Sequence, residues 1–162
     1  MAARQFHYHA GDMKIEFLSC PVQASLRVLG REWAFLVLTS IALFRANRYN
    51  DMVRAMPGLS KRLLSMRLAE LEQAGFIVRA ERRRGFVRWE LTAKGADVVP
   101  ILLTMVQFGA RWYADELFAD HAPHGLGEIF DEAYIRQTLG IHPRRGLASL
   151  DAQPGPGSLE RR

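Results

Sequence analysis

Apolar residues recur at helical spacing in the first part of the chain and predict two helices. The first helix is expected to start at Cys20–Pro21 and to end at Gly30, since proline suits a first helical position and glycine a helix end. Its apolar stripe consists of Val22, Leu26 and Leu29. The next stretch, 31–44, is apolar almost all round, which predicts a helix buried on several sides. This second helix would be the centre of the core.

Two shorter helices, joined by a Pro-Gly turn, are expected next. The first covers 50–56, with Asn50 as its capping residue, and the turn is Pro57–Gly58. The second covers about 60–73, with Ser60 as its N-cap, and is closed by Gly75. Its inner face is formed by Leu64, Leu68 and Leu71. Such a pair of helices is a helix-turn-helix.

A β-hairpin is predicted directly after the helix-turn-helix. Two β-prone runs, 77–82 and 86–91, flank a short turn of sequence Arg-Arg-Gly. The glycine, Gly85, can adopt the positive φ that a tight turn requires. Such a hairpin is the wing of a winged helix, so we expect an α+β fold that is mainly helical.

Further helices are expected after the wing. Thr92 should cap one long helix that runs to about Leu117, with Pro100 kinking its first turns, and an amphipathic helix should follow over 125–139. The last residues are rich in Pro, Gly and Ser, which is typical of disorder. We therefore divide the chain into an arm (1–19), a winged-helix domain (20–118), a helical extension (119–147) and a disordered tail (148–162).

Positive charge is concentrated on the predicted winged helix. From Arg45 to Lys94 there are twelve lysines and arginines against five acids, a formal charge of +7, whereas the remainder carries −2. A local basic field of this kind is expected of a protein that binds nucleic acid. With 162 residues, of which 49% are hydrophobic, the chain is long enough for one domain with a core.

The helix over 60–73 has the pattern of a recognition helix. At ~100° per residue, Leu64, Leu68 and Leu71 share one face, and the opposite face is small, polar or basic. Recognition helices read base edges with such outward residues. Arg62 suits guanine, Ser65 a base or a phosphate, and Met66 a thymine methyl. For Arg62 alone, an ordinary solvated charge is an equal alternative.

Other basic residues lie where they would hold the DNA backbone. Lys61 and Arg67 suit phosphates beside the recognition helix, and a wing tip with arginines can enter a narrow minor groove. The predicted DNA-binding residues are Arg48, Arg54, Ser60, Lys61, Arg62, Ser65, Met66, Arg67, Arg82, Arg83, Arg84 and Arg88.

Several motifs, in the same order, resemble the HxlR family of bacterial winged-helix regulators, which are relatives of the MarR group. They are Cys20-Pro-Val with Leu26 to Gly30, Trp33, Arg48-Tyr-Asn-Asp51, Pro57-Gly-Leu-Ser-Lys-Arg-Leu-Leu-Ser65, Glu70-Leu-Glu-Gln-Ala-Gly-Phe-Ile-Val-Arg79 and Glu90-Leu-Thr-Ala-Lys-Gly95. The resemblance implies a homodimer, built from dimerisation helices at the two ends of the domain, on a two-fold operator in double-stranded DNA. Met66 replaces the Glu that is common in the family, which leaves the operator sequence open.

The single cysteine, Cys20, is a candidate redox sensor. It lies at the start of a predicted helix, where unpaired N–H groups and the helix dipole favour a thiolate. By resemblance, some family members use this cysteine to react with oxidants or electrophiles. The alternative is a small apolar cap residue. A disulfide would need the partner subunit's Cys20 or a small thiol.

Other functional classes find less support in the sequence. Phosphate-binding loops, nucleophile elbows and His-Glu-x-x-His motifs are missing, and the histidines do not have metal-ligand spacing, so we expect neither an enzyme nor a metal or cofactor. Trp33, Phe108, Trp112 and Tyr113 could line an apolar effector pocket between the second and last helices, but aromatic residues at helical spacing are far more often part of the core. The alternative function is a winged helix that binds protein, against which the basic hairpin argues. Without a signal peptide or a membrane-length apolar segment, we expect a cytoplasmic protein.

Overall fold

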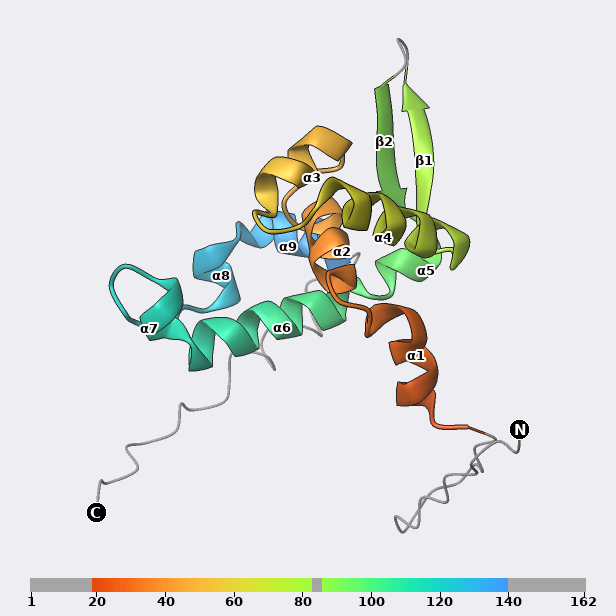
Figure 1. Ribbon diagram of the computed structural model, residues 1–162. Coiled ribbons are helices and arrows are strands. Elements are labelled where there is room, and N and C mark those ends of the chain that lie inside the picture. The colour runs from red at the N-terminus through yellow and green to blue at the C-terminus, as the bar shows by residue number, and fades with distance from the viewer. Residues whose placement is uncertain (1–18, 83–85, 140–162) are drawn as a thin grey trace.

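The computed structural model describes residues 19–82 and 86–139, and helices dominate this part of the chain. Figure 1 shows the hairpin together with α3 (Tyr49–Ala55) and α4 (Lys61–Gln73) at one end of the molecule, and α6 (Val99–Trp112) at the other. This confirms the mainly helical α+β class. The elements are α1 (Pro21–Leu29), α2 (Ala34–Ala42), α3 (Tyr49–Ala55), α4 (Lys61–Gln73), β1 (Ile77–Arg82), β2 (Phe86–Leu91), α5 (Ala93–Ala96), α6 (Val99–Trp112), α7 (Ala114–Leu117), α8 (Leu126–Ile129) and α9 (Glu132–Leu139).

Helix α2 is the centre of the core, as its apolar sequence predicted. Val37 and Leu38 are fully buried, and α2 packs against α1, α3, α4, α6 and β2. The helix is shorter than expected, since it begins at Ala34 rather than at residue 31. Trp33 adopts a left-handed conformation with a φ of +72°, which is incompatible with continuing the helix toward the N-terminus.

Helix α4 follows the predicted pattern closely. The hydroxyl of Ser60 accepts a hydrogen bond of 3.2 Å from the backbone N–H of Leu63, so Ser60 is the N-cap. Leu64, Leu68 and Leu71 are buried, and Gly75 follows the helix with a φ of +76°. The helix-turn-helix core is therefore fixed by local signals that the sequence contains.

The predicted cap of α3 was wrong by two residues. Arg48, not Asn50, is the N-cap. The segment before it pairs with the hairpin, because the backbone N–H of Trp89 donates to the Asn47 carbonyl at 2.9 Å and Arg48 forms an isolated bridge with Arg88. The chain is thus strand-like up to Arg48 and turns helical immediately afterwards.

The base of the hairpin is a tight joint between α4, β1 and α5. The Thr92 hydroxyl donates to the Gly75 carbonyl at 2.6 Å and accepts from the Gly95 N–H at 3.1 Å. A Cβ atom at Gly95 would lie 2.0 Å from the Phe76 carbonyl oxygen, so only glycine fits. Thr92 is a helix cap, as predicted.

The long helix expected from Thr92 to Leu117 is instead three helices, α5, α6 and α7. Pro100 does not kink a continuous helix. It stands in the first turn of α6, where its missing N–H leaves no backbone group unpaired. The apolar spacing runs across both breaks, which explains why the sequence suggested one helix.

The expected helix over 125–139 is also divided, into α8 and α9. Phe130 between them has extended backbone angles, and Leu126 and Ile135 on either side are buried in the common core. The Tyr134 hydroxyl donates to the Ala42 carbonyl at 3.0 Å and also contacts that of Leu43, at the C-terminal end of α2. Residues 126–139 therefore close one side of the core.

Three predicted regions fall partly or wholly outside the described residues: the arm (1–19), of which only Ser19 is described, the end of the helical extension (140–147) and the whole tail (148–162). In the described part of the chain, no helix is both long and apolar enough to cross a membrane.

Candidate nucleic-acid interface

The outward face of α4 carries the residues that the sequence assigned to base reading. Arg62, Ser65 and Met66 are all exposed, while the leucines opposite them are buried. Lys61, in the first turn, is also exposed. The structure thus places these side chains as expected, and their contacts with DNA stay a prediction.

Arg67 corrects the predicted contact set. Its side chain is buried, with 8% of the residue exposed, rather than directed outward to a phosphate. Its Nε donates to the Glu32 carbonyl at 2.6 Å, and its Nη1 pairs with the Glu70 carboxylate at 2.6 Å. Arg67 therefore ties α4 to the turn before α2, and it is removed from the candidate DNA contacts.

Tyr49, at the start of α3, is a site residue that the sequence analysis missed. Its hydroxyl donates to the Lys61 carbonyl at 2.8 Å and lies 3.1 Å from the Ser65 hydroxyl. The ring thus connects α3 to the exposed first turns of α4. Its partners are 12 and 16 residues away in sequence, so no local pattern could have revealed them.

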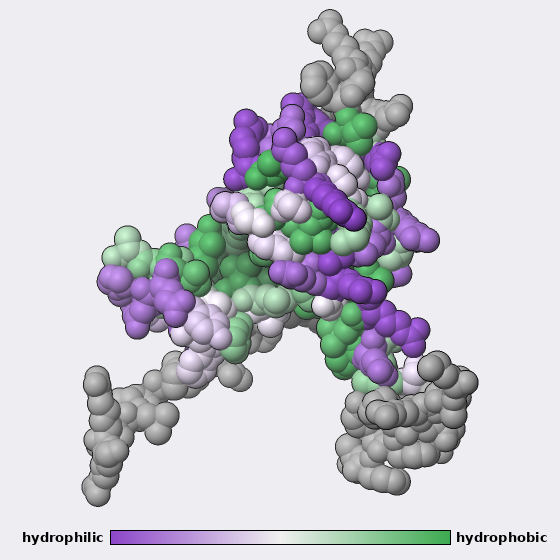
Figure 2. All heavy atoms as spheres, viewed as in Figure 1, coloured by the Kyte–Doolittle hydropathy of each residue, from purple (hydrophilic) through white to green (hydrophobic). Residues whose placement is uncertain are grey.

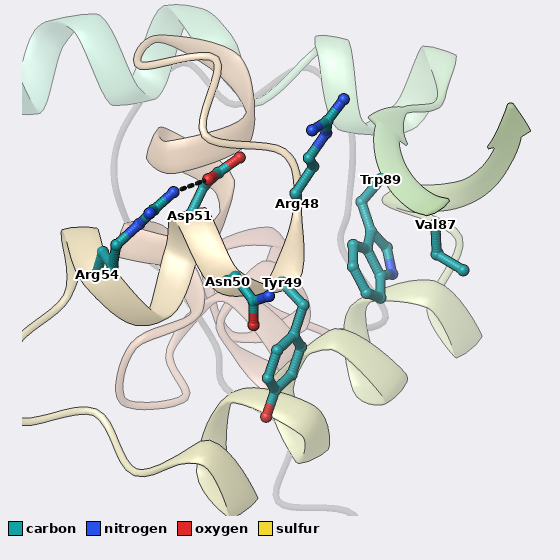
Figure 3. A pocket seen from close by; sticks show the side chains of 7 residues that line it. All are labelled: Arg48, Tyr49, Asn50, Asp51, Arg54, Val87 and Trp89. Atoms are coloured by element: carbon teal, nitrogen blue, oxygen red, sulfur yellow. Dashed lines mark hydrogen bonds and ion pairs between the residues drawn. The ribbon is translucent and has the colours of Figure 1, made fainter. Parts of the chain in front are cut away.

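An open groove of roughly 500 Å³ separates α3 from the hairpin. Figure 3 shows the α3 side chains on one side of it and Val87 and Trp89 of β2 on the other. Arg54 is largely exposed and forms an ion pair with Asp51. Such a surface pair is weak, so a phosphate could replace the carboxylate. The groove residues are Arg48, Tyr49, Asn50, Asp51, Arg54, Val87 and Trp89.

The wing has the predicted strands in antiparallel register, with Ile77 opposite Leu91 and Arg82 opposite Phe86. Arg88 is half-buried on β2. Arg83 and Arg84, at the predicted tip, lie outside the described residues, as does the side chain of Arg82. Their contact with the minor groove stays a prediction.

Cys20 is the N-cap of α1, directly before Pro21 in the first turn. It is buried, with 9% of the residue exposed. The placement at a helix N-terminus agrees with the sequence prediction. Its reactivity stays a prediction.

The surfaces of α1 and α6 are unusually apolar. Phe108, Trp112 and Tyr113, for which the sequence favoured a place in the core over a pocket, are instead more than half exposed. The rings of Trp112 and Tyr113 each pack on that of Phe108, with centroids 6.4 and 6.2 Å apart. In Figure 2 hydrophilic residues gather over α3 and α4, whereas a hydrophobic patch lies on the side of α1 that faces α6. The exposed apolar residues of these helices and of the adjoining α7 are Val22, Leu26, Ile101, Met105, Phe108, Trp112, Tyr113 and Leu117.

Comparison with known proteins points to one group of regulators. The model of the HxlR-like helix-turn-helix family matches residues 28–117. An uncharacterized HTH-type transcriptional regulator of Synechocystis, sll1512, is 34% identical over 100 residues, which are 60% of this chain and 73% of that protein. Among solved structures, the candidate transcription factor PA1607 aligns with a TM-score of 0.54 and 30% identity, covering 67% of this chain and 72% of the other. A candidate MarR-family regulator from Porphyromonas gingivalis W83 aligns with a TM-score of 0.50 and 30% identity, covering 60% and 96%.

Proposed function

The chain belongs to the HxlR-like helix-turn-helix family and is a DNA-binding transcriptional regulator of that type, and from this premise we propose that it represses genes as a homodimer on a specific two-fold operator. Helix α4 lies in the major groove, and the wing over 82–88 follows the minor groove or the backbone. The regulator acts in the cytoplasm. No enzymatic family is indicated by the comparisons.

The observation that carries the proposal is the division of α4 into two faces. Its leucines are buried against the core, while Arg62, Ser65 and Met66 face solvent on the end of the molecule that also carries α3 and the hairpin. A helix whose apolar face packs on the core and whose exposed face is polar and basic has the arrangement of a recognition helix in a major groove. The segment from Arg45 to Lys94, which contains α3, α4 and the hairpin, carries a formal charge of +7, as suits a polyanionic partner.

Two arginine variants test the proposed roles against each other. Arg62→Ala should relax specificity at one base step by roughly 1–3 kcal/mol, because Arg62 contacts a base edge. Arg84→Ala should weaken binding to all sequences and reduce the slope of log affinity against log salt, because Arg84 contacts the backbone or the minor groove. Binding of selected and random duplexes is measured by fluorescence anisotropy over a salt series.

Arg31→Ala is the matched control for the loss of one exposed arginine. Arg31 lies beside the C-terminal end of α4, together with Gln73 and Ala74, away from the reading face. The Arg31→Ala variant should leave unchanged both the sequence specificity and the slope of log affinity against log salt. Equal, sequence-independent losses from the Arg62 and Arg84 variants would contradict base reading by Arg62. Failure of the wild type to bind DNA would favour the alternative, a protein-binding winged helix.

The homodimer is proposed from the apolar residues that α1 and α6 expose. Folded proteins rarely leave a contiguous set of large apolar side chains in water unless another surface covers it. The aromatic cluster of Phe108, Trp112 and Tyr113 is the kind of group that dominates an interface. A second copy carries the same apolar surface, and a two-fold operator requires two copies of α4.

Cys20 is proposed as the site at which an oxidant or electrophile releases the regulator from DNA. Support comes from its place at the N-terminus of α1, next to the proposed dimer surface. Diamide or a quinone should release the wild type from its operator, and Cys20→Ser should abolish that release while leaving DNA affinity unchanged. Equal release of both proteins would contradict the sensor role.

A further inference from the structure

Two consecutive hydrogen bonds fix the hydroxyl group of Ser65 on the proposed reading face. The Tyr49 hydroxyl donates to the Lys61 carbonyl at 2.8 Å. The same Tyr49 oxygen lies 3.1 Å from the Ser65 hydroxyl oxygen, at hydrogen-bonding distance. The three groups come from α3 and from the first turns of α4, so the arrangement depends on the packing of these two helices.

The direction of the second bond follows from the number of protons. A tyrosine hydroxyl carries one proton, and that of Tyr49 is engaged by the Lys61 carbonyl, which can only accept. Tyr49 must therefore accept from Ser65, whose own single proton is then directed into the protein. The exposed Ser65 oxygen therefore offers its lone pairs as hydrogen-bond acceptors, and its proton is engaged by Tyr49.

This polarity restricts what Ser65 can bind on DNA. Phosphate oxygens accept hydrogen bonds, as do the keto groups of guanine and thymine and the N7 atoms of purines. The donors in the major groove are the exocyclic amino groups of adenine and cytosine. Because an acceptor needs a donor, the choice narrows to these two bases. Arg62, three residues earlier, has only hydrogen-bond donors and therefore suits base atoms that accept, such as O6 and N7 of guanine.

We propose that Ser65 reads an exocyclic amino group, adenine N6 or cytosine N4, and that Tyr49 is the positioning residue that imposes this choice. The inference rests on the proposed function, in which α4 enters the major groove. Tyr49 itself contacts no base in this account. Its hydroxyl decides whether Ser65 presents an acceptor or a donor.

The test is selection from a duplex library of randomised sequence by the purified full-length protein. Wild type should enrich adenine or cytosine, against guanine or thymine, at one position in each half-site. Ser65→Ala should lose this preference there and nowhere else. Tyr49→Phe should lose it too, since the released Ser65 hydroxyl can then donate to keto groups. The expected loss of discrimination is roughly 2- to 10-fold for one hydrogen bond.

A base analogue then tests the amino group directly. Replacing the selected adenine by purine, or the cytosine by 2-pyrimidinone, removes the amino group alone and should weaken wild-type binding by a similar factor. Ser65→Ala should not distinguish the analogue from the natural base. The double variant, Tyr49→Phe with Ser65→Ala, should match Ser65→Ala alone, because Tyr49 acts only through Ser65.

Each remaining outcome contradicts a definite statement. If Tyr49→Phe keeps the amino preference that Ser65→Ala loses, the positioning role is wrong. If Ser65→Ala changes no position, or the position it changes favours keto bases, the reading by Ser65 is wrong. If the wild type enriches no motif, the proposed function itself fails. Unchanged thermal unfolding of both variants shows that altered selection does not come from misfolding.

Discussion

The two longest helices of the described residues, α4 and α6, are alike in length and opposite in what they expose. Both bury leucines, among them Leu64 and Leu71 on α4 and Leu102 and Leu103 on α6. The free face of α4 carries arginine, serine and methionine, whereas that of α6 carries Ile101, Met105, Phe108 and Trp112. The buried faces make them members of one core, and the exposed faces suit different kinds of partner.

The difference teaches that an apolar stripe alone does not say what covers it. On α4 the apolar stripe is covered by the same chain, so the free face can remain polar and hydrated. On α6, the elements α2, α8 and α9 cover one side. The other side remains apolar, which suits a second protein surface better than a highly charged nucleic acid.

The largest expected effect comes from the buried stripe of α4. Leu71→Ala should lower the free energy of unfolding by about 2–5 kcal/mol, because it removes fully buried methyl groups and leaves a cavity. Urea denaturation followed by circular dichroism measures this value. Leu36→Ala, a matched change at an exposed leucine of α2, should cost less than about 0.5 kcal/mol. Similar losses for the two variants would mean that the α4 stripe is not the core.

A smaller and different effect is expected on the exposed face of α6. Phe108→Ala should weaken dimerisation roughly tenfold or more, as removal of an aromatic interface anchor does, with the fold retained in the dissociated protein. Analytical ultracentrifugation over a dilution series measures the dissociation constant. Phe44→Ala, at another exposed phenylalanine, is the control and should leave the constant unchanged. An unaltered dimer, or a monomeric wild type, would argue against the proposed interface.

The smallest effect is expected at Tyr134 of α9, a helix that covers one side of α6. Tyr134→Phe should destabilise the fold by about 1 kcal/mol, since the carbonyls at the end of α2 lose their hydroxyl donor. Dimerisation and DNA affinity should stay at wild-type values, because α9 contributes to neither proposed surface. Thermal unfolding, ultracentrifugation and DNA titration of the same sample distinguish these effects. A dimerisation defect would place the extension at the interface instead.

The elements that local signals define could be predicted from the sequence. Ser60 caps α4 by accepting a hydrogen bond from the backbone N–H of Leu63, only three residues later. The two strands have the boundaries that their β-prone runs indicated. The breaks around α6 could not be predicted, because the apolar spacing continues through them. Pro100 is compatible both with a kinked helix and with a new first turn. Which of the two forms depends on how α5 and α6 pack.

The candidate site shows the same limit. Arg62, Ser65 and Met66 could be placed on the outward face of α4 from helical geometry alone. The position of the Arg67 side chain could not be predicted in this way, because it depends on a hydrogen bond to the Glu32 carbonyl, 35 residues away in sequence. Tyr49 could not be identified from the sequence either, because the hydrogen-bonding partners of its hydroxyl, Lys61 and Ser65, belong to another helix.

The close fit at Gly95 has a consequence for the operator. The joint that contains it connects the end of α4 and the base of the wing to α5 and, after two residues, to α6. In the proposed dimer, α6 fixes one copy against the other, so this joint determines how far apart the two recognition helices stand. The number of base pairs between the operator half-sites would then be a measure of the joint's geometry.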